Sequence, residues 1–340
     1  MGGGGSSRHV FPGDCDGRDG GLARPVARAD RRPAEAEAAF KTLVAAAERD
    51  PDPDRLPDDA VDAYRILYRE AGLDSAGAGA APGADHDLFD PQDIYDEWRE
   101  AEEELAGQGA LPFGGSVVGG LLSPLRVLSF WTMKTRARTV GEAGPAALLR
   151  ALHAAVPAGR TVRFHAMGHS FGCIVISAMA AGPAGSPPRE DLLDTVFLVQ
   201  GALSLWSYCN DIPEAPGTAG YFRRMIDEHR VSGPIVIVHS EHDTACGTFY
   251  PIGSRLSASF AFGGFPKYGA LGSFGAQGPG NDPVAMTMKP AGDAYGFTDG
   301  RLYNIDGSPY IRARHGLAGA HSDIAHPEVA HAFWSAVAGA

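Results

Sequence analysis

The stretch TVRFHAMGHSFGCIVISAMA, at residues 161–180, constrains the fold more than any other part of this chain. An apolar segment leads into the pentapeptide GHSFG, and a second apolar segment follows at once. This order predicts a buried strand, a sharp turn and a helix that packs on the sheet. A G-x-S-x-G turn between a strand and a helix is typical of a nucleophile elbow, in which a strained backbone exposes the serine hydroxyl.

Each residue of the turn has an expected role. Ser170 is the candidate nucleophile, and the backbone N–H of Phe171 is the expected donor to an oxyanion. Gly168 and Gly172 are expected to let strand and helix pass without a Cβ clash, and His169 completes the elbow. With 45 glycines in the chain, the pentapeptide alone is a weak signal, and an ordinary glycine-rich turn is the alternative. Its place between a predicted strand and a predicted helix favours the elbow.

The length of 340 residues allows one large α/β domain with an appendage, or two domains. The sequence has no apolar run long enough to span a bilayer, and its first ten residues lack the features of a secretory signal. We therefore expect no integral membrane segment and a cytoplasmic protein. The four cysteines have no paired spacing and are interpreted as reduced thiols.

The acidic charge is concentrated in one segment. The formal net charge is −12, and residues 51–110 hold 17 acidic residues against four arginines and no lysine, so the rest of the chain is nearly neutral. No basic stripe remains to neutralise phosphates. This distribution argues against nucleic acid or an anionic membrane as a partner.

The pattern of the chain divides it into three parts. Residues 1–35 are rich in Gly, Arg, Asp and Pro and are expected to be disordered or poorly ordered. Residues 36–110 form an acidic segment with three amphipathic helices, predicted over 34–48, 58–72 and 91–105. These helices are simple packing elements or, alternatively, a lid over the serine. Residues 111–340 are expected to be the α/β core.

Within the core, unbroken apolar runs predict a mostly parallel sheet with helices on both faces. A helix is expected from Thr139 to the elbow strand, a short helix over 220–228, a long loop over 260–280 and a closing helix over 328–338. Besides the elbow strand, the expected strands are Val127 to Trp131, Thr195 to Gln200, Pro234 to His239 and Leu302 to Ile311.

A serine nucleophile needs a histidine that takes its proton and a carboxylate that orients the imidazole. The acid is expected just after a strand that follows the elbow, and Asp243 lies four residues beyond PIVIVH. Asp194 precedes its strand and falls at the wrong end of the sheet. Glu241 lies too close to the strand end, so Asp243 is preferred.

The histidine is expected between the last strand and the last helix. His321 occupies that place, whereas His326 begins the helix and is the weaker candidate. A metal site is not expected, because His321, His326 and His331 are spaced by five and fall on different faces of a helix. His239, His242 and Asp243 lack a fourth ligand nearby. No cofactor is expected either.

The residues from about Val127 to the C-terminus resemble the α/β-hydrolase superfamily, and more closely a group of poorly characterised bacterial serine hydrolase-like proteins. The resembling stretches are SFWTMKTRARTVGE, AMGHSFG, FLVQGALS, GPIVIVHSEHDTACGTFYPIGSRL, GSFGAQGPG and AHSDIAHPEVA. The resemblance implies that Ser170 is the nucleophile, His321 the general base, Asp243 its orienting acid and the Phe171 N–H one oxyanion donor.

The N-terminal third departs from this pattern. Similar proteins have strands before SFW, and one of them ends in an HG-type turn that supplies the second oxyanion N–H. The nearest candidate here is Arg8 to Gly13, which is short, so the first strands of the fold are predicted to be degenerate or missing. Their loss would remove several buried side chains at about 1.5 to 3 kcal/mol each.

Two functions of different classes follow from these residues. The first is a serine hydrolase that cleaves an uncharged or cationic small-molecule carboxylic ester or thioester through an acyl-serine intermediate. The second is a hydrolase-like module without catalysis that binds a partner, which the missing HG turn and the acidic helices favour. A peptidase or amidase has no residue signature in its favour, and the oligomeric state is open.

Overall fold

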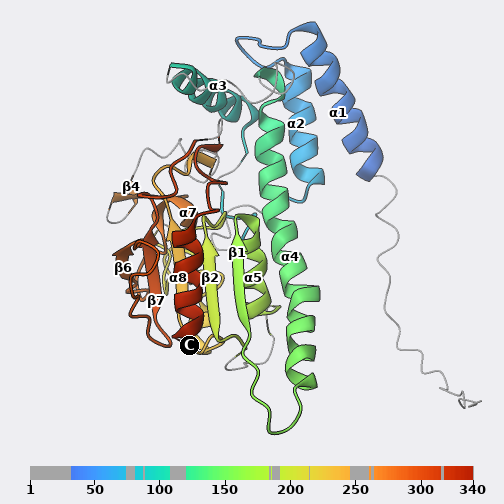
Figure 1. Ribbon diagram of the computed structural model, residues 1–340. Helices are drawn as coiled ribbons and strands as arrows, with labels where there is room; N and C mark the ends of the chain where they lie inside the picture. The colour runs from blue at the N-terminus through green and yellow to red at the C-terminus, as the bar shows by residue number, and fades with distance from the viewer. Residues whose placement is uncertain are drawn as a thin grey trace, which may run out of the picture.

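The computed structural model of the chain describes residues 32–73, 81–86, 89–107, 120–183, 185, 192–213, 215–245, 260–261, 264–314 and 318–339. It is an α/β protein with a parallel sheet, flanked by helices, and a helical lobe beyond the sheet (Figure 1). None of the helices described is both long and apolar enough to cross a membrane. The candidate strand at Arg8 to Gly13 lies outside the described residues.

Five parallel strands form the main sheet, in the order β1-β2-β3-β7-β6. A two-stranded antiparallel sheet, β4 (Phe260–Ala261) with β5 (Phe265–Pro266), lies beside it. The main strands are β1 (His165–His169), β2 (Thr195–Val199), β3 (Ile235–His239), β6 (Val284–Thr287) and β7 (Leu302–Asp306).

The sheet is covered on both faces because its central strands are apolar on both sides. On β2, Val196 and Leu198 pack in the core that includes α5 (Phe171–Ala181), whereas Phe197 and Val199 pack in the core that includes α8 (Pro327–Ala338). Every residue of β2 is buried. The predicted parallel sheet with helices on both faces is therefore confirmed.

The elbow strand β1 pairs with β2 and is the first strand of the five-stranded sheet. Among the described residues, no strand pairs with its other edge. Met167 on β1 and Val162 just before it are exposed apolar side chains. The strand that similar proteins place between SFW and the elbow strand is thus not found in the described part of the chain.

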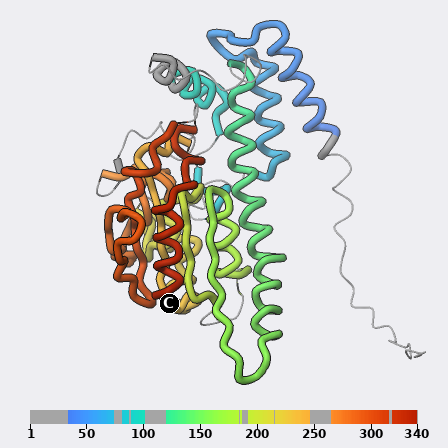
Figure 2. Tube along the Cα trace, viewed as in Figure 1, coloured from blue at the N-terminus to red at the C-terminus, as the bar shows by residue number. Residues whose placement is uncertain are grey.

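The helical lobe is formed by α1 (Arg32–Arg49), α2 (Asp58–Glu70), α3 (Pro91–Gly107) and the short helix η1 (Gly120–Leu122). The lobe lies beyond the carboxyl ends of the strands (Figure 2). Its core contains Leu43, Tyr64, Tyr95 and Trp98. The three predicted helices are confirmed, but α1 already begins at Arg32, within the segment expected to be poorly ordered.

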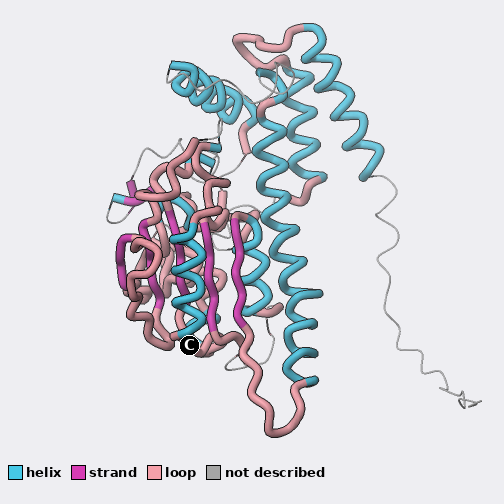
Figure 3. The backbone as a smooth tube through the Cα atoms, in the orientation of Figure 1, coloured by secondary structure: helices cyan, strands magenta, loops and turns pink. Residues whose placement is uncertain are grey.

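The longest helix, α4 (Pro124–Ala155), corrects one sequence-based prediction. Val127 to Trp131 was expected to be a strand because VLSFW favours β structure, but these residues form its second and third turns (Figure 3). Val127, Trp131 and Lys134 are buried at helical spacing, with Ala137 and Gly141 continuing the same face. The packing of the 32-residue helix outweighs the preference of these five residues for a strand.

Two smaller features differ from the sequence pattern. Ala39 and Leu43 of α1 are buried, whereas the larger Phe40 is 48% exposed. The strand β6 was not predicted, because the four-residue segment VAMT is an edge strand with alternating exposure. Two short helices, α6 (Arg224–Asp227) and α7 (Leu271–Phe274), complete the described elements.

Candidate active site

The turn after β1 has the geometry of a nucleophile elbow. Ser170 has φ 57° and ψ −124°, a conformation that non-glycine residues rarely adopt, and it is the residue just before α5. Helix α5 begins at Phe171, so the Phe171 N–H is one of the first amides without an intrahelical acceptor. The strained turn therefore places the serine hydroxyl beside a helix N-terminus, where negative charge is stabilised.

The two glycines of the elbow differ in their spatial constraints. A Cβ built on Gly168 would lie 2.7 Å from the backbone C and O atoms of Gly172, so this close approach requires glycine. A Cβ on Gly172 would meet no atom within 4 Å. The expectation that both glycines prevent a clash is right for Gly168 and wrong for Gly172.

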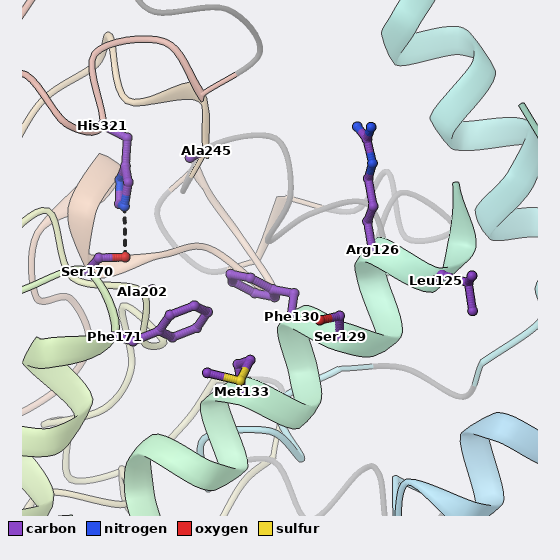
Figure 4. A pocket seen from close by; sticks show the side chains of 10 residues that line it. All are labelled: Leu125, Arg126, Ser129, Phe130, Met133, Ser170, Phe171, Ala202, Ala245 and His321. Carbon is purple, nitrogen blue, oxygen red and sulfur yellow. Dashed lines mark hydrogen bonds between the residues drawn. The ribbon is translucent and has the colours of Figure 1, made fainter. Parts of the chain in front are cut away.

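Three side chains from separate loops form one hydrogen-bonded chain. The Ser170 hydroxyl and His321 Nε2 lie 2.8 Å apart (Figure 4), and His321 Nδ1 lies 2.9 Å from Asp243 Oδ2 and 3.1 Å from Oδ1. The carboxylate accepts from Nδ1–H, which leaves Nε2 as the acceptor for the serine hydroxyl. The arrangement can thus take a proton from Ser170.

Parallel topology brings these residues together. Ser170 follows β1 directly, Asp243 follows β3 after a turn and His321 lies in the loop between β7 and α8. The carboxyl ends of parallel strands meet at one edge of a sheet, which is where ligand sites of open α/β sheets are found. The serine, the acid and the histidine, which are far apart in the sequence, therefore come into contact at this edge.

The turn that carries Asp243 is fixed by its own hydrogen bonds. The Asp243 N–H donates to the carbonyl of Ser240, and the Ser240 hydroxyl donates to the carbonyl of Ile311. The Asp243 side chain is fully buried. The Ala320 N–H donates to the His242 carbonyl at 2.8 Å, which ties the loop of His321 to the turn of Asp243.

Two further side chains hold the backbone of His321. His169 Nε2–H donates to the His321 carbonyl at 2.8 Å, and Gln200 Nε2 donates to the carbonyls of Ala320 and His321 at 2.9 and 3.2 Å. Burial lowers the pKa of His169 below the usual value for histidine, while its hydrogen bond to His321 acts in the opposite direction. The contact with the His321 carbonyl needs a proton on Nε2, which the Nε2–H tautomer of neutral His169 supplies.

The competing candidates lie elsewhere. Asp194 accepts a hydrogen bond from the Phe164 N–H at the opposite end of the sheet, and the Glu241 side chain is largely exposed. His326 is the residue before α8 and pairs with Asp323 at 3.0 Å. His331 contacts the carbonyl of Asp293. No group of three possible metal ligands is found among the described residues.

A pocket of about 580 Å³ opens next to the Ser170 hydroxyl (Figure 4). One wall is formed by the first three turns of α4. The opposite wall is formed by the start of α5 and by the loops that follow the strands. The Phe130 and Phe171 rings are in contact within it, with centroids 5.4 Å apart and planes tilted by 47°. The lining residues are Leu125, Arg126, Ser129, Phe130, Met133, Ser170, Phe171, Ala202, Ala245 and His321.

Sequence reasoning found the three residues of the hydrogen-bonded chain and missed most of their surroundings. It treated His169 only as part of the elbow, and Gln200 only as the end of a strand. The α4 wall was missed because Val127 to Trp131 was expected to be a strand. The helical spacing of Val127, Trp131 and Lys134 was the available signal for the correct assignment.

No protein-family model, curated protein or solved structure matches this chain.

Proposed function

We propose that this protein is a serine hydrolase of the α/β-hydrolase type that cleaves a carboxylic ester or thioester. The observation that carries the proposal is the hydrogen-bonded chain of Ser170, His321 and Asp243, with Ser170 at a strained strand-to-helix turn. A pocket of mainly apolar side chains beside the hydroxyl supports a small organic substrate.

The first half of the reaction transfers the acyl group to the serine. The Ser170 oxygen attacks the carbonyl carbon while its proton passes to His321 Nε2, and the buried Asp243 stabilises the imidazolium that forms. The Phe171 N–H donates to the developing oxyanion. When the C–O or C–S bond breaks, His321 gives its proton to the leaving alcohol or thiol, and an acyl-serine ester remains.

The second half restores the enzyme. Water attacks the acyl-serine carbonyl and gives one proton to His321 Nε2, and the bond to Ser170 breaks. His321 returns the proton to the serine oxygen, and a carboxylic acid leaves. The two steps consume one ester and one water and release one alcohol or thiol and one acid.

The oxyanion stabilisation determines the expected rate. Losing one donor typically costs about 3 kcal/mol, or roughly a hundred- to a thousand-fold in rate. Among the described residues, no strand pairs with the outer edge of β1, where similar proteins have the strand that supplies their second donor. A slow enzyme is therefore the expectation.

A fluorophosphonate probe tests this function, because it phosphonylates only an activated serine. The native protein should be labelled, and Ser170→Ala should not. Ser177→Ala is the matched control: Ser177 is buried on the same helix, where it contacts the Cys173 carbonyl and the Tyr208 hydroxyl, and its loss should leave labelling intact. A folded native protein that takes up no probe would overturn the proposal in favour of a binding module without catalysis.

A further inference from the structure

A single arginine interrupts the apolar lining of the pocket. Arg126 lies on α4 one turn before Phe130, and its side chain stands apart from Ser170 and His321, on the far side of the Phe130 and Phe171 rings (Figure 4). Among the described lining residues it is the one arginine or lysine, and none is an aspartate or glutamate; the others have apolar or hydroxyl side chains, apart from His321, which is hydrogen-bonded to Ser170.

The guanidinium of Arg126 has no carboxylate partner in the described part of the chain. Its Cζ atom lies over the ring of the buried Trp98 on α3, 5.2 Å from the ring centroid. By contrast, Arg138 on the same helix is paired with Glu142 at 3.2 Å, and Arg99 lies within 4 Å of Asp52. Arginine has five N–H donors, and no described side chain accepts a hydrogen bond from the Arg126 guanidinium, so it can donate to a bound anion.

The local charge therefore opposes the charge of the whole chain. The net charge of −12 favours an uncharged or cationic substrate, but the pocket itself presents a cation at one end and an apolar surface between that cation and Ser170. A half-buried arginine fixed over an aromatic ring is suited to a carboxylate, which it binds through two parallel hydrogen bonds.

We propose that the substrate is an ester or thioester with an apolar chain that ends in an anionic group, and that Arg126 binds this group. The inference rests on the proposed hydrolase function and deepens it. The ester carbonyl lies at Ser170, the apolar chain passes Phe130, Met133 and Phe171, and the anion lies at Arg126. Arg126 acts in substrate recognition and takes no part in the chemical steps.

Matched ester pairs test this arrangement. p-Nitrophenyl half-esters of dicarboxylic acids with four to ten carbons are compared with their methyl-ended counterparts of equal chain length. The native protein should show an about tenfold or larger preference in kcat/KM for the anionic member at one or more chain lengths, mainly through KM. Added salt should reduce this preference. A second series with a neutral acyl group and phenol or carboxyphenol as leaving group shows whether the anion belongs to the acyl or the leaving-group side.

Three variants separate recognition from packing. Arg126→Met keeps an apolar side chain over Trp98 and should lower kcat/KM for the anionic esters about tenfold or more relative to the neutral esters, so that the preference is lost. Arg126→Glu should reverse it in favour of amino-ended esters. Arg136→Met is the matched control, because Arg136 is an exposed arginine on α4 that does not line the pocket, and it should behave as the native protein.

The outcomes distinguish this inference from the hydrolase function. Equal kcat/KM for both members of every pair, in a native protein that the fluorophosphonate labels and that hydrolyses the neutral esters, would overturn the role of Arg126 alone. An equal loss on neutral and anionic esters in Arg126→Met would assign Arg126 to packing and also overturn it. Absence of labelling and of all hydrolysis would instead overturn the hydrolase function on which the inference rests.

Discussion

At the scale of single residues, the elbow shows how backbone crowding fixes the position of a nucleophile. The strand and helix cross so closely at Gly168 that the backbone of Gly172 occupies the space of a Cβ. Ser170 takes a positive φ at the same turn. The position of the hydroxyl thus depends on the absence of a side chain at Gly168.

The two elbow glycines provide a matched pair of variants. Gly168→Ala forces the turn apart, and we expect a loss of about 1–3 kcal/mol in the free energy of unfolding. Fluorophosphonate labelling should slow about a hundred-fold, because small displacements at a reacting centre are costly. Gly172→Ala has free space and should change the free energy of unfolding by less than about 1 kcal/mol. Urea unfolding and labelling rates measure both effects; equal behaviour of the two variants would contradict this account.

A second residue-scale prediction concerns His239 at the end of β3. Burial lowers the pKa of His239 below the ordinary value of 6.5, although Asp306 acts in the opposite direction. As the pH falls through 6.5, the unfolded chain takes up a proton that the folded protein does not, so the free energy of unfolding decreases towards acidic pH. This contribution is fully present above pH 6.5. For one histidine the slope is limited to about 1.4 kcal/mol per pH unit.

Urea denaturation between pH 7.5 and 5 tests the effect. His239→Gln should give a shallower dependence of the free energy of unfolding on pH than the native protein. His229→Asn, at an exposed position with positive φ, is the control for the loss of one histidine. A native-like slope in His239→Gln would show that this residue does not contribute.

At the scale of elements, a buried ion pair joins α4 to the segment between α2 and α3. Lys134 on α4 contacts Asp85, and both side chains are 1% exposed. Asp85 also accepts a hydrogen bond from the Gly83 N–H, and the adjacent His86 ring stacks on Trp131 at 3.8 Å. Lys134 also lies 5.7 Å from the centroid of Phe130, which lines the pocket. The ion pair thus lies next to Phe130, a pocket-lining residue of α4, and helps to fix the position of this helix.

Removing one member of this pair should be strongly destabilising. Lys134→Met leaves the buried Asp85 carboxylate without its cation, and we expect a loss of about 3–5 kcal/mol in the free energy of unfolding. Lys41→Met is the control: it removes an exposed bond to Glu37 and should cost less than about 0.5 kcal/mol. Chemical denaturation measures both. If the double variant Lys134→Met, Asp85→Leu is no more stable than Lys134→Met alone, an uncompensated charge is not the cause.

At the scale of the whole molecule, the sequence was most informative where one signal decides the structure. The apolar runs of β2 and β3 favour strands in a sheet covered on both faces, and the acid and the histidine were expected in the segments that follow later strands. The contact of Ser170 with His321 was therefore predictable across 151 residues.

The remaining features depend on packing between distant segments. The strand predicted at Val127 to Trp131 is helical because Trp131 packs on the His86 ring and into the lobe core, contacts that no local window contains. The pocket could not be predicted, because its wall belongs to this misassigned segment. The same holds for Arg126, whose position at the pocket depends on the direction of α4.

The continuous helix α4 connects the core of the helical lobe with the core of the sheet. Its first turns fill the lobe core with Val127, Leu128 and Trp131, and its later turns fill the sheet core with Ala137 and Leu149. At 1.5 Å per residue, its 32 residues form a rod of about 48 Å without an intervening loop. If either end of α4 unwinds, the core into which that end packs loses apolar contacts. We therefore expect the two cores to unfold together, and a cut made between lobe and sheet would leave each half without the α4 residues that complete its core.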